Sequence, residues 1–276
     1  MDAIVLSGGG SNPEDPLYGL SAGKAKALLP IAGKPMVQWV LDALAGASCV
    51  SRVIIVGLGA DHGLNYPGTI LYAPDAGSLL GNIRKGLELS AADGLGSGTV
   101  MVVSSDIPAI QPSMIDWMAR QATELPVDLC YCSIDRSVME ARFPGSGRSY
   151  IHFRDRVVCG GDLTVVDAGI LAGGNHIWRR LIDGRKSALR MALAVGIDVL
   201  VLLLCRRLGV DDLIRVAQTR LGISGRVIHS PYAELGMDVD KPYQFDLVES
   251  CLLARADPRT SGDHHASGDS ADLRKP

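Results

Sequence analysis

The feature that most restricts the fold of this chain is a repeated alternation of short apolar runs with stretches of helical periodicity. The runs that read as strands are residues 3–6, 52–56, 99–103, 127–134 and 226–229. Helical signals occupy residues 36–44, 79–87, 113–122, 212–221 and 240–253. Such alternation is typical of a parallel sheet with helices on both faces. We therefore expect a three-layer α/β/α fold with a mostly parallel, Rossmann-like sheet.

Helix ends are marked by particular residues. Ser78 is a plausible N-cap for the helix that begins at residue 79, and Ser113 with Asp116 forms a plausible capping pair for the next helix. Gly222 closes the helix that ends at residue 221.

Two segments depart from this alternation. Residues 137–190 are richer in Gly and Arg, so we expect an insertion that covers one face of the site. Residues 257–276 are mainly Gly, Ser, Asp and His with few apolar residues, a composition typical of disorder. The expected organisation is one domain over residues 1–253, followed by a disordered tail.

Charge and composition exclude several classes of protein. A net charge of -3 and a pI near 6.1 argue against a nucleic-acid-binding surface, which would be basic. The uninterrupted apolar run 199–205 is far shorter than the ~20 residues that a membrane span needs. The six cysteines lack zinc-ligand spacing and no signal peptide is apparent, so we expect a cytoplasmic protein.

A glycine-rich loop follows the first strand. In Ser7-Gly8-Gly9-Gly10 the absence of side chains lets backbone N–H groups approach an anion such as a triphosphate, although the same glycines suit an ordinary flexible turn. The dinucleotide-binding fingerprint is excluded because Pro13 occupies the position of its third glycine. The P-loop is excluded because the spacing from Gly19 to Lys24 is one residue short.

Two aspartates are candidate magnesium ligands. Asp106 follows the strand 99–103, at the edge of an open α/β sheet where ligands bind. Asp240, in Asp238-Val239-Asp240, precedes the last helix and is also a suitable N-cap for it. Mg²⁺ is commonly held by one or two carboxylates together with phosphate oxygens and water. Two such carboxylates suffice for Mg²⁺ beside a phosphate, although a loop aspartate such as Asp106 also suits the capping of a turn.

These motifs together resemble the signature of nucleotidyltransferases of the GT-A-like fold, most of all the MobA-like NTP transferases. The matching runs are Leu6-Ser7-Gly8-Gly9-Gly10 and, after residues 11–25, Lys26-Ala27-Leu28-Leu29-Pro30-Ile31-Ala32-Gly33-Lys34-Pro35-Met36. The resemblance implies that Leu6 to Gly10 bind the triphosphate and that Lys26 neutralises the reacting phosphate. Where the family usually has an Arg after the glycines, this chain has Ser11 and Asn12, with Lys24 and Lys34 as available replacements. Ala25 replaces the usual Pro before the lysine.

The resemblance assigns further roles. Asp106, in Ser105-Asp106-Ile107-Pro108, and Asp240 match the metal ligands of the family, with Asp238 as the second match for the latter. Ser78 and Asn82 lie in the segment that borders the nucleobase and ribose, where helix capping is an equal alternative. A basic, Gly-containing cluster includes Arg148, Tyr150, Gly161 and Asp162, the last where relatives often carry Asn. Such a cluster suits an acceptor phosphate, and it suits the solvated surface of a long loop equally well.

The implied reaction is a Mg²⁺-dependent transfer of a nucleoside monophosphate from an NTP to a small phosphorylated acceptor. Lys26 and Asp106 are the expected catalytic residues, GTP and CTP are the favoured donors, and pyrophosphate is released. One alternative is a glycosyltransferase of the same fold that uses Asp238-Val239-Asp240 as its Asp-x-Asp motif. Another is a non-catalytic nucleotide-binding protein, which the missing Arg favours.

Overall fold

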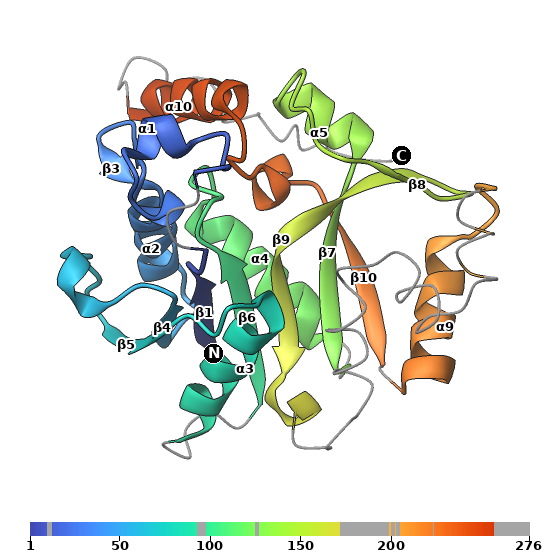
Figure 1. The fold of residues 1–276 in the computed structure, drawn as a ribbon. Coiled ribbons are helices and arrows are strands. Elements are labelled where there is room, and N and C mark those ends of the chain that lie inside the picture. The colour runs from blue at the N-terminus through green and yellow to red at the C-terminus, as the bar shows by residue number, and fades with distance from the viewer. Residues whose placement is uncertain are drawn as a thin grey trace, which may run out of the picture.

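A central sheet of eight strands organises the computed structural model, which describes residues 1–9, 13–92, 98–124, 127–171, 199, 202, 205–222 and 224–256. The main path of the sheet has the order β10-β7-β9-β6-β1-β4-β5, and β8 pairs with β9 beside this path (Figure 1). The strands are β1 Asp2–Leu6, β4 Arg52–Val56, β5 Thr69–Ala73, β6 Thr99–Ser104, β7 Leu129–Asp135, β8 Ile151–His152, β9 Val157–Asp167 and β10 Gly225–Ser230. A separate antiparallel ribbon joins β2 Pro30–Ile31 and β3 Lys34–Pro35.

Helices connect most of these strands. The α-helices are α1 Tyr18–Ser21, α2 Met36–Gly46, α3 Leu79–Ala92, α4 Pro112–Thr123, α5 Arg136–Arg142, α9 Val210–Leu221 and α10 Pro242–Ala256. Short 3-10 helices are η1 Lys26–Leu28, η2 Ala60–His62, η3 Ala168–Leu171 and η4 Ala233–Gly236. As expected, Gly222 ends α9 in the left-handed conformation, with φ 62°.

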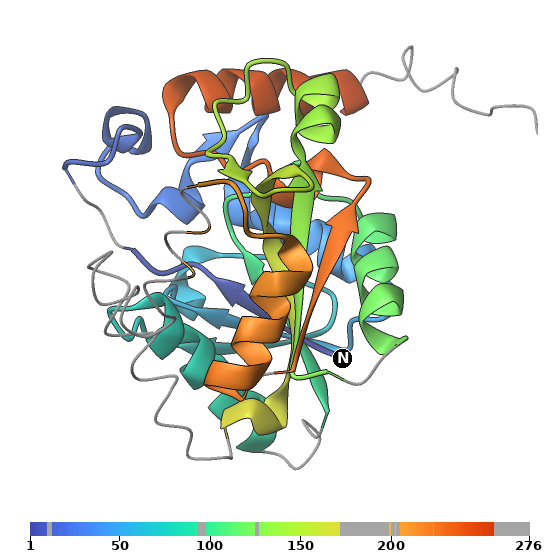
Figure 2. The same ribbon diagram turned by 90° about the vertical axis from the view of Figure 1, so that its right-hand side faces the viewer.

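Two apolar cores lie on opposite faces of the sheet and make the expected three layers. On β1, Ala3 and Val5 face the larger core, which includes residues of α2, α4 and α10. Ile4 points to the other face, where the second core includes Leu87 of α3. This division follows from the period of two in a strand, which sends successive side chains to opposite faces. Figure 2 shows α3 and α4 on the two sides of the sheet.

The sheet is mostly parallel, as the sequence predicts. β1 pairs in parallel with β4 and β6, β4 with β5, and β7 with β10. The exception is β9, which lies between β6 and β7 and is antiparallel to both.

Part of the segment expected as an insertion, residues 137–190, belongs to the central sheet as β9. Within the described part of that segment, β9 contributes buried Leu163 and Val165 to the larger core, so it is an integral strand. The remainder, residues 172–190, lies outside the described residues, and so does the expected tail 257–276.

The start of α4 also differs from its expected capping pair. Gln111 is the N-cap, Pro112 lies in the first turn, and no side chain caps the helix. Asp116 instead accepts hydrogen bonds from the backbone N–H groups of Ser48 (3.1 Å) and Cys49 (3.0 Å). Asp116 therefore binds the backbone of the segment after α2 and does not cap its own helix.

No helix among the described residues is long and apolar enough to cross a membrane.

Candidate active site

The candidate site lies at the carboxyl ends of β1 and β6. These strands are parallel neighbours with Leu6 opposite Ser104, so the loops that follow them leave the sheet at the same edge. The C=O of Leu6 accepts a hydrogen bond from the N–H of Ser105 (3.1 Å), which holds the two loops together. The Oγ of Ser104 donates to Oδ1 of Asp106 at 2.5 Å and orients this carboxylate.

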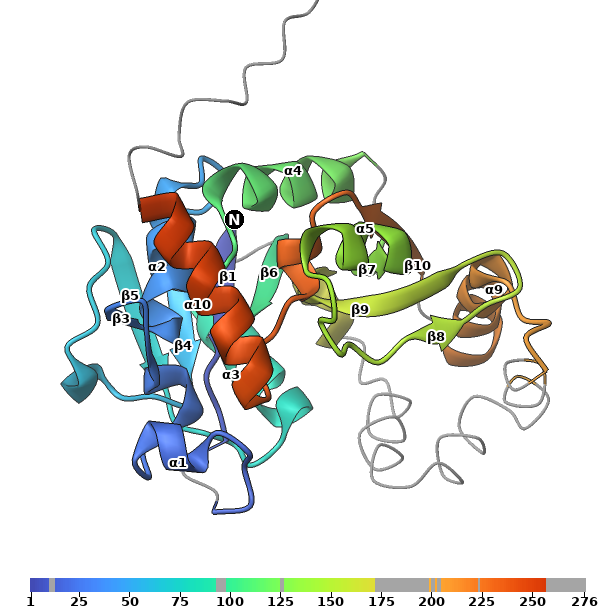
Figure 3. The ribbon, with the colours of Figure 1, turned by 90° about the horizontal axis from the view of Figure 1, so that it is seen from above.

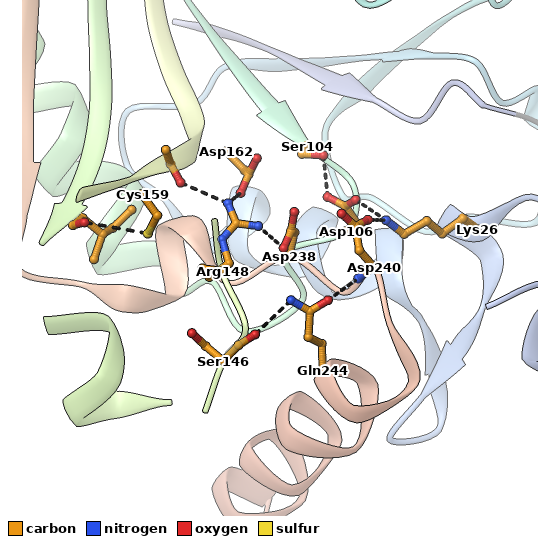
Figure 4. Close-up of polar contacts among 12 residues, drawn as sticks. Lys26, Ser104, Asp106, Ser146, Arg148, Cys159, Asp162, Asp238, Asp240 and Gln244 are labelled. Carbon is orange, nitrogen blue, oxygen red and sulfur yellow. Dashed lines mark hydrogen bonds and ion pairs between the residues drawn. The ribbon is translucent and has the colours of Figure 1, made fainter. Parts of the chain in front are cut away.

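The segment before α10 reaches the same edge. The N–H of Val239 donates to the C=O of Asp106 at 3.0 Å, which brings Asp238 and Asp240 next to that residue. The view from above shows α10 crossing this end of the sheet (Figure 3). The two aspartates that the sequence selects, Asp106 and Asp240, are therefore neighbours in space although they are far apart in the chain (Figure 4).

Lys26 lies between these two aspartates. Its ammonium forms ion pairs with Asp106 (2.7 Å) and with Asp240. Burial alone would lower the pKa of Lys26, but the two carboxylates outweigh it and raise that pKa. Burial likewise opposes ionisation of Asp240, yet the ammonium of Lys26 holds the Asp240 pKa below its ordinary value. The Asp240 carboxylate pairs with Lys26, and the backbone N–H of Asp240 donates to Oε1 of Gln244 in α10 (3.0 Å).

A second cation, Arg148, organises the acidic residues beside this cluster. Its guanidinium forms ion pairs with Asp238 and with Asp162 (3.4 Å), and donates to the C=O of Gly160 (3.1 Å). Burial raises the pKa of Asp162, and the nearby charges of Asp106 and Asp238 raise it further. Burial also raises the pKa of Asp238 despite its pairing with Arg148. The site therefore holds four carboxyl groups against two cations.

This donor set fits Mg²⁺. Carboxylate oxygens are the hard ligands that Mg²⁺ prefers, and the mutual repulsion of the four carboxyl groups favours an added cation. Asp106 and Asp240 already share one cation, the ammonium of Lys26. Among the described residues no group of three or more His, Cys, Asp or Glu side chains could hold a metal by itself. The arrangement suits a cation that takes its remaining ligands from phosphate and water.

The glycine-rich loop is held against β4 and the segment after β5. The N–H of Ser7 donates to the C=O of Val56 (2.8 Å), and Ser7 Oγ is buried with no hydrogen-bond partner among the described residues. A Cβ on Gly8 would overlap Nδ2 of Asn82, so a larger residue there would have to displace that amide or the loop. Gly9 has φ 91° and donates its N–H to Asp75 Oδ2 (3.1 Å). Gly10, with the replaced positions Ser11 and Asn12, lies outside the described residues.

The predicted base-side residues both have partners within the protein. Asn82 is buried, donates from Nδ2 to Asp75 (3.0 Å) and accepts at Oδ1 from the N–H of Ala76 (2.7 Å). Ser78 accepts the N–H of Gly81 (3.1 Å) at its Oγ, the capping contact that the sequence allows as an alternative. Asn82 thus shapes the segment after β5.

Asp75 opens the segment expected to border the nucleobase and ribose, but it was not itself selected from the sequence as a candidate site residue. Hydrogen bonds from the N–H groups of Gly9 and Gly77 and from Asn82 lower its pKa. It lies just after β5, at the same edge as Asp106, so the rule that ligands gather at strand ends would have selected it. The signal was lost because β5 was not recognised as a strand.

The predicted acceptor-side residues divide into two groups. Arg148 forms ion pairs with both Asp162 and Asp238. The phenol of Tyr150 instead donates to Glu140 Oε1 (2.6 Å), and burial with this bond raises the pKa of Tyr150 to about 12. Gly161 serves close packing, since a Cβ there would lie 2.8 Å from the Sγ of Cys132.

The two lysines available to replace the family Arg differ in their surroundings. Lys34 pairs with Asp42 (2.6 Å) and lies over the ring of Trp39, at 4.5 Å from the centroid. The ammonium of Lys34 is therefore already paired with residues of α2. Lys24 is exposed and donates its backbone N–H to Ser21.

Gln244 is a second residue that sequence reasoning missed. It is buried, accepts the N–H of Asp240 (3.0 Å) and donates to the C=O of Ser146 (3.0 Å). A glutamine in the first turn of a helix is a known capping signal, but its contact with Ser146 has no signature in the sequence.

Comparison with known proteins identifies a matching family and several similar proteins. Residues 3–161 match the model of the MobA-like NTP transferase domain. The bifunctional protein GlmU of Rhodospirillum rubrum is 34% identical over 107 residues, which are 37% of this chain and 23% of that protein. GlmU of Agrobacterium fabrum is 30% identical over 132 residues, 46% of this chain and 27% of that protein. The chain thus spans about a quarter of the length of these curated relatives.

Solved structures extend the similarity to nearly the whole chain. A hypothetical transferase from Thermus thermophilus has a TM-score of 0.77 and 34% identity, covering 88% of this chain and 98% of that one. CMP:2-keto-3-deoxy-manno-octonic acid synthetase complexed with CTP has a TM-score of 0.59 at 14% identity (92% and 100% covered). The 4-diphosphocytidyl-2C-methyl-D-erythritol synthase of Anaerococcus prevotii has a TM-score of 0.55 at 12% identity (91% and 95% covered). The last two show the fold alone.

Proposed function

This chain belongs to the MobA-like NTP transferase family, and from that premise we propose that it transfers a nucleoside monophosphate from GTP or CTP to a small phosphorylated acceptor. One observation carries the proposal. Lys26, Asp106 and Asp240 come from three distant parts of the chain and meet in a single ion-paired cluster at the carboxyl ends of β1 and β6. A nucleotidyltransferase needs this combination of a cation and two metal-binding carboxylates where the triphosphate binds.

In the proposed mechanism, the glycine-rich loop and Lys26 bind the triphosphate and Lys26 neutralises its charge. Asp106 and Asp240 would hold Mg²⁺, which supplies Lewis-acid stabilisation of the negative charge on the phosphate oxygens. An oxygen of the acceptor phosphate forms a bond to the α-phosphorus, and the bond from this phosphorus to the α,β-bridging oxygen breaks. Pyrophosphate leaves with the electron pair. Since an acceptor phosphate is already ionised, no general base is required.

Two findings support the choice of donor. The family is defined by the use of an NTP, which favours a free triphosphate over a nucleotide-sugar. One structural neighbour was solved with CTP, and another is named for a cytidyl product. The Asp238-Val239-Asp240 run, which resembles a glycosyltransferase motif, precedes the last described helix, whereas that motif belongs near the middle of the domain.

The proposal is tested by thermal melting with ATP, GTP, CTP and UTP, each with and without Mg²⁺. A ligand that binds the folded state raises the melting temperature by mass action. We expect a Mg²⁺-dependent rise with GTP or CTP that is lost in Asp106→Ala and kept in Asp42→Ala, whose carboxylate pairs with Lys34 on the surface. No rise with any NTP, or an equal rise in Asp106→Ala, would refute the proposal. A rise with nucleotide-sugars alone would indicate the glycosyltransferase.

The acceptor is then sought by measuring pyrophosphate release with sugar, polyol and pterin phosphates, using the nucleotide that stabilises the protein. Release that requires one of these acceptors and is lost in Asp106→Ala is the expected result.

A further inference from the structure

One buried side chain, Gln244, connects the nucleotide side of the site with its acceptor side. Its amide oxygen accepts the N–H of Asp240, and its amide nitrogen donates to the C=O of Ser146, both at 3.0 Å. Gln244 is 2% exposed and Ser146 is 0% exposed, so water has little access to either bond. Figure 4 shows Gln244 between these two residues, at the beginning of α10.

Helix capping explains only half of this arrangement. In a capping box, the third helical residue accepts a backbone N–H at the helix start, for which a Glu serves as well as a Gln. In α10 the accepted amide is that of Asp240, two residues before the helix begins at Pro242. The donor half of the amide makes no contribution to capping, because it bonds a residue 98 positions away.

The segment that receives this bond carries Arg148. Glu140 of α5 holds the same segment from its other side, by accepting the N–H of Gly145 (2.9 Å) and the phenol of Tyr150 (2.6 Å). The start of α10 also covers it, since a Cβ on Gly147 would lie 2.7 Å from Cζ of Tyr243. Two residues after Ser146, Arg148 reaches the carboxylates of Asp162 and Asp238.

We propose that Gln244 is a positioning residue that keeps the Arg148-bearing segment in register with the Asp240 loop. It acts through Asp240 on the nucleotide side and through Ser146 on the acceptor side. This inference rests on the proposed function, because that function assigns the two sides. Nucleotide binding that orders the Asp240 loop would then order residues 145–150 as well, before the acceptor is attacked.

Three variants distinguish the effects of the two hydrogen bonds of the Gln244 side-chain amide from the effect of core packing. Gln244→Glu preserves the shape and the acceptor for Asp240 but turns a carboxylate oxygen toward the C=O of Ser146. Gln244→Leu removes both hydrogen bonds. Val248→Ala is the matched control, because Val248 is fully buried one turn further along α10 and lies in the larger core.

Hydrogen exchange of the amides in residues 145–150 is measured on the full chain without ligand. Loss of a buried hydrogen bond is expected to speed exchange there by about tenfold in both Gln244 variants. Val248→Ala is expected to leave exchange in this segment within about twofold of the native chain, because it removes core packing and not the bridge. Equal exchange in the native chain and both Gln244 variants, or an equal increase in Val248→Ala, would overturn the proposal.

The second measurement adds the α,β-methylene analogue of GTP or CTP with Mg²⁺. In the native chain we expect the analogue to slow exchange in residues 145–150. Each variant is measured at analogue concentrations that saturate it by calorimetry, because Gln244→Leu also removes the acceptor for Asp240 and is expected to lower the affinity. In saturated Gln244→Leu the slowing in residues 145–150 should disappear, and retained slowing there would overturn the positioning role. If the native chain binds neither analogue, the proposed function fails, and the unliganded comparison alone decides whether Gln244 holds the segment.

Discussion

At the scale of single residues, Lys26 supplies the charge that balances Asp106 and Asp240. We expect Lys26→Met to weaken binding of the Mg²⁺–nucleotide complex by roughly 10- to 100-fold, because a hydrogen bond to a charged group contributes ~1.5–3 kcal/mol. Calorimetric titration with the nucleotide found by thermal melting measures this. Lys34→Met is the control, since Lys34 pairs with Asp42 on the surface. Equal affinity in Lys26→Met and the native chain would contradict the role of Lys26.

Asp2 provides a residue-scale prediction about stability. Its carboxylate is buried and accepts hydrogen bonds from Arg52 (2.5 and 3.0 Å) and from the hydroxyl of Ser90 (2.7 Å). Asp2→Asn removes the carboxylate charge from the buried ion pair with Arg52, and breaking a buried pair typically costs ~3–5 kcal/mol. Urea unfolding is expected to show a loss of this size. Asp61→Asn, at a carboxylate whose side chain is 82% exposed, should change the free energy of unfolding by less than ~0.5 kcal/mol.

The buried pair of Asp2 and Arg52 also predicts how the free energy of unfolding depends on pH. Burial opposes ionisation of Asp2, but the hydrogen bonds from Arg52 and Ser90 outweigh it and lower the Asp2 pKa below 3.8. The unfolded state therefore binds this proton first, so the stabilisation is present above pH ~4 and is lost as the pH falls through the folded pKa. The stability difference between the native chain and Asp2→Asn should shrink below pH ~4. A difference that stays constant down to pH 2 would contradict this.

The sequence identifies residues whose role is tied to a local motif. Lys26, Asp106 and Asp240 each follow or precede a recognisable run, and the structure brings all three together. Sequence patterns could not identify Gln244, because its contact with Ser146 depends on how α10 packs against a loop about a hundred residues earlier in the chain. The pairing of Arg148 with Asp162 and Asp238 was hidden for the same reason.

At the scale of elements, the packing of the glycine-rich loop against α3 gives a prediction for Gly8. A Cβ there would overlap Asn82 Nδ2 and lie 3.1 Å from Asp75 Oδ1, so Gly8→Ala must displace the loop or the start of α3. We expect a stability loss of ~1–3 kcal/mol, the usual cost of overpacking, together with weaker nucleotide binding. Denaturant unfolding and nucleotide-dependent melting measure the two effects.

Gly19 is the matched control for that substitution. A Cβ at Gly19 would have nothing within 4 Å, and the residue lies within the short helix α1. Gly19→Ala should therefore leave stability unchanged or slightly higher, since alanine loses less backbone freedom in a helix. Equal losses in Gly8→Ala and Gly19→Ala would contradict the packing explanation.

Most elements could be predicted because their periodicity is local. The strand expected at residues 52–56 is β4 as observed, and the helix expected from residue 79 is α3. The strand β9 was not predicted, because Gly160, Gly161 and Asp162 interrupt its apolar pattern. These glycines are required where β9 passes Cys132 and Tyr131 closely, beside a register irregularity in its pairing with β7.

At the scale of the whole molecule, both cores depend on the same sheet. β1 and β4 send alternate side chains into each core, so neither core can form without these strands. We expect Leu41→Ala in the larger core and Leu87→Ala in the second to lower one shared unfolding transition, each by ~2–5 kcal/mol. The double variant should be additive within ~0.5 kcal/mol, because the sites lie on opposite faces. Denaturant unfolding followed by circular dichroism and tryptophan fluorescence measures this, and two separate transitions would contradict it.

The layer arrangement could be predicted from the alternation alone, whereas the direction of every strand could not. A buried strand has the same apolar pattern whether it is parallel or antiparallel to its neighbours. The direction of β9 follows from its connections to β7 and β6, which are a property of the assembled chain.

The hydrogen bond from Val239 to Asp106 has a consequence for the order of synthesis. The ribosome makes Lys26 and Asp106 early, but Asp240 and Gln244 belong to the beginning of α10, the last helix described. Because domains form from the N-terminus as the chain emerges, a nascent chain can build much of the sheet before it possesses a complete site. Under the proposed mechanism, a partly made molecule would leave nucleoside triphosphates unreacted until α10 docks.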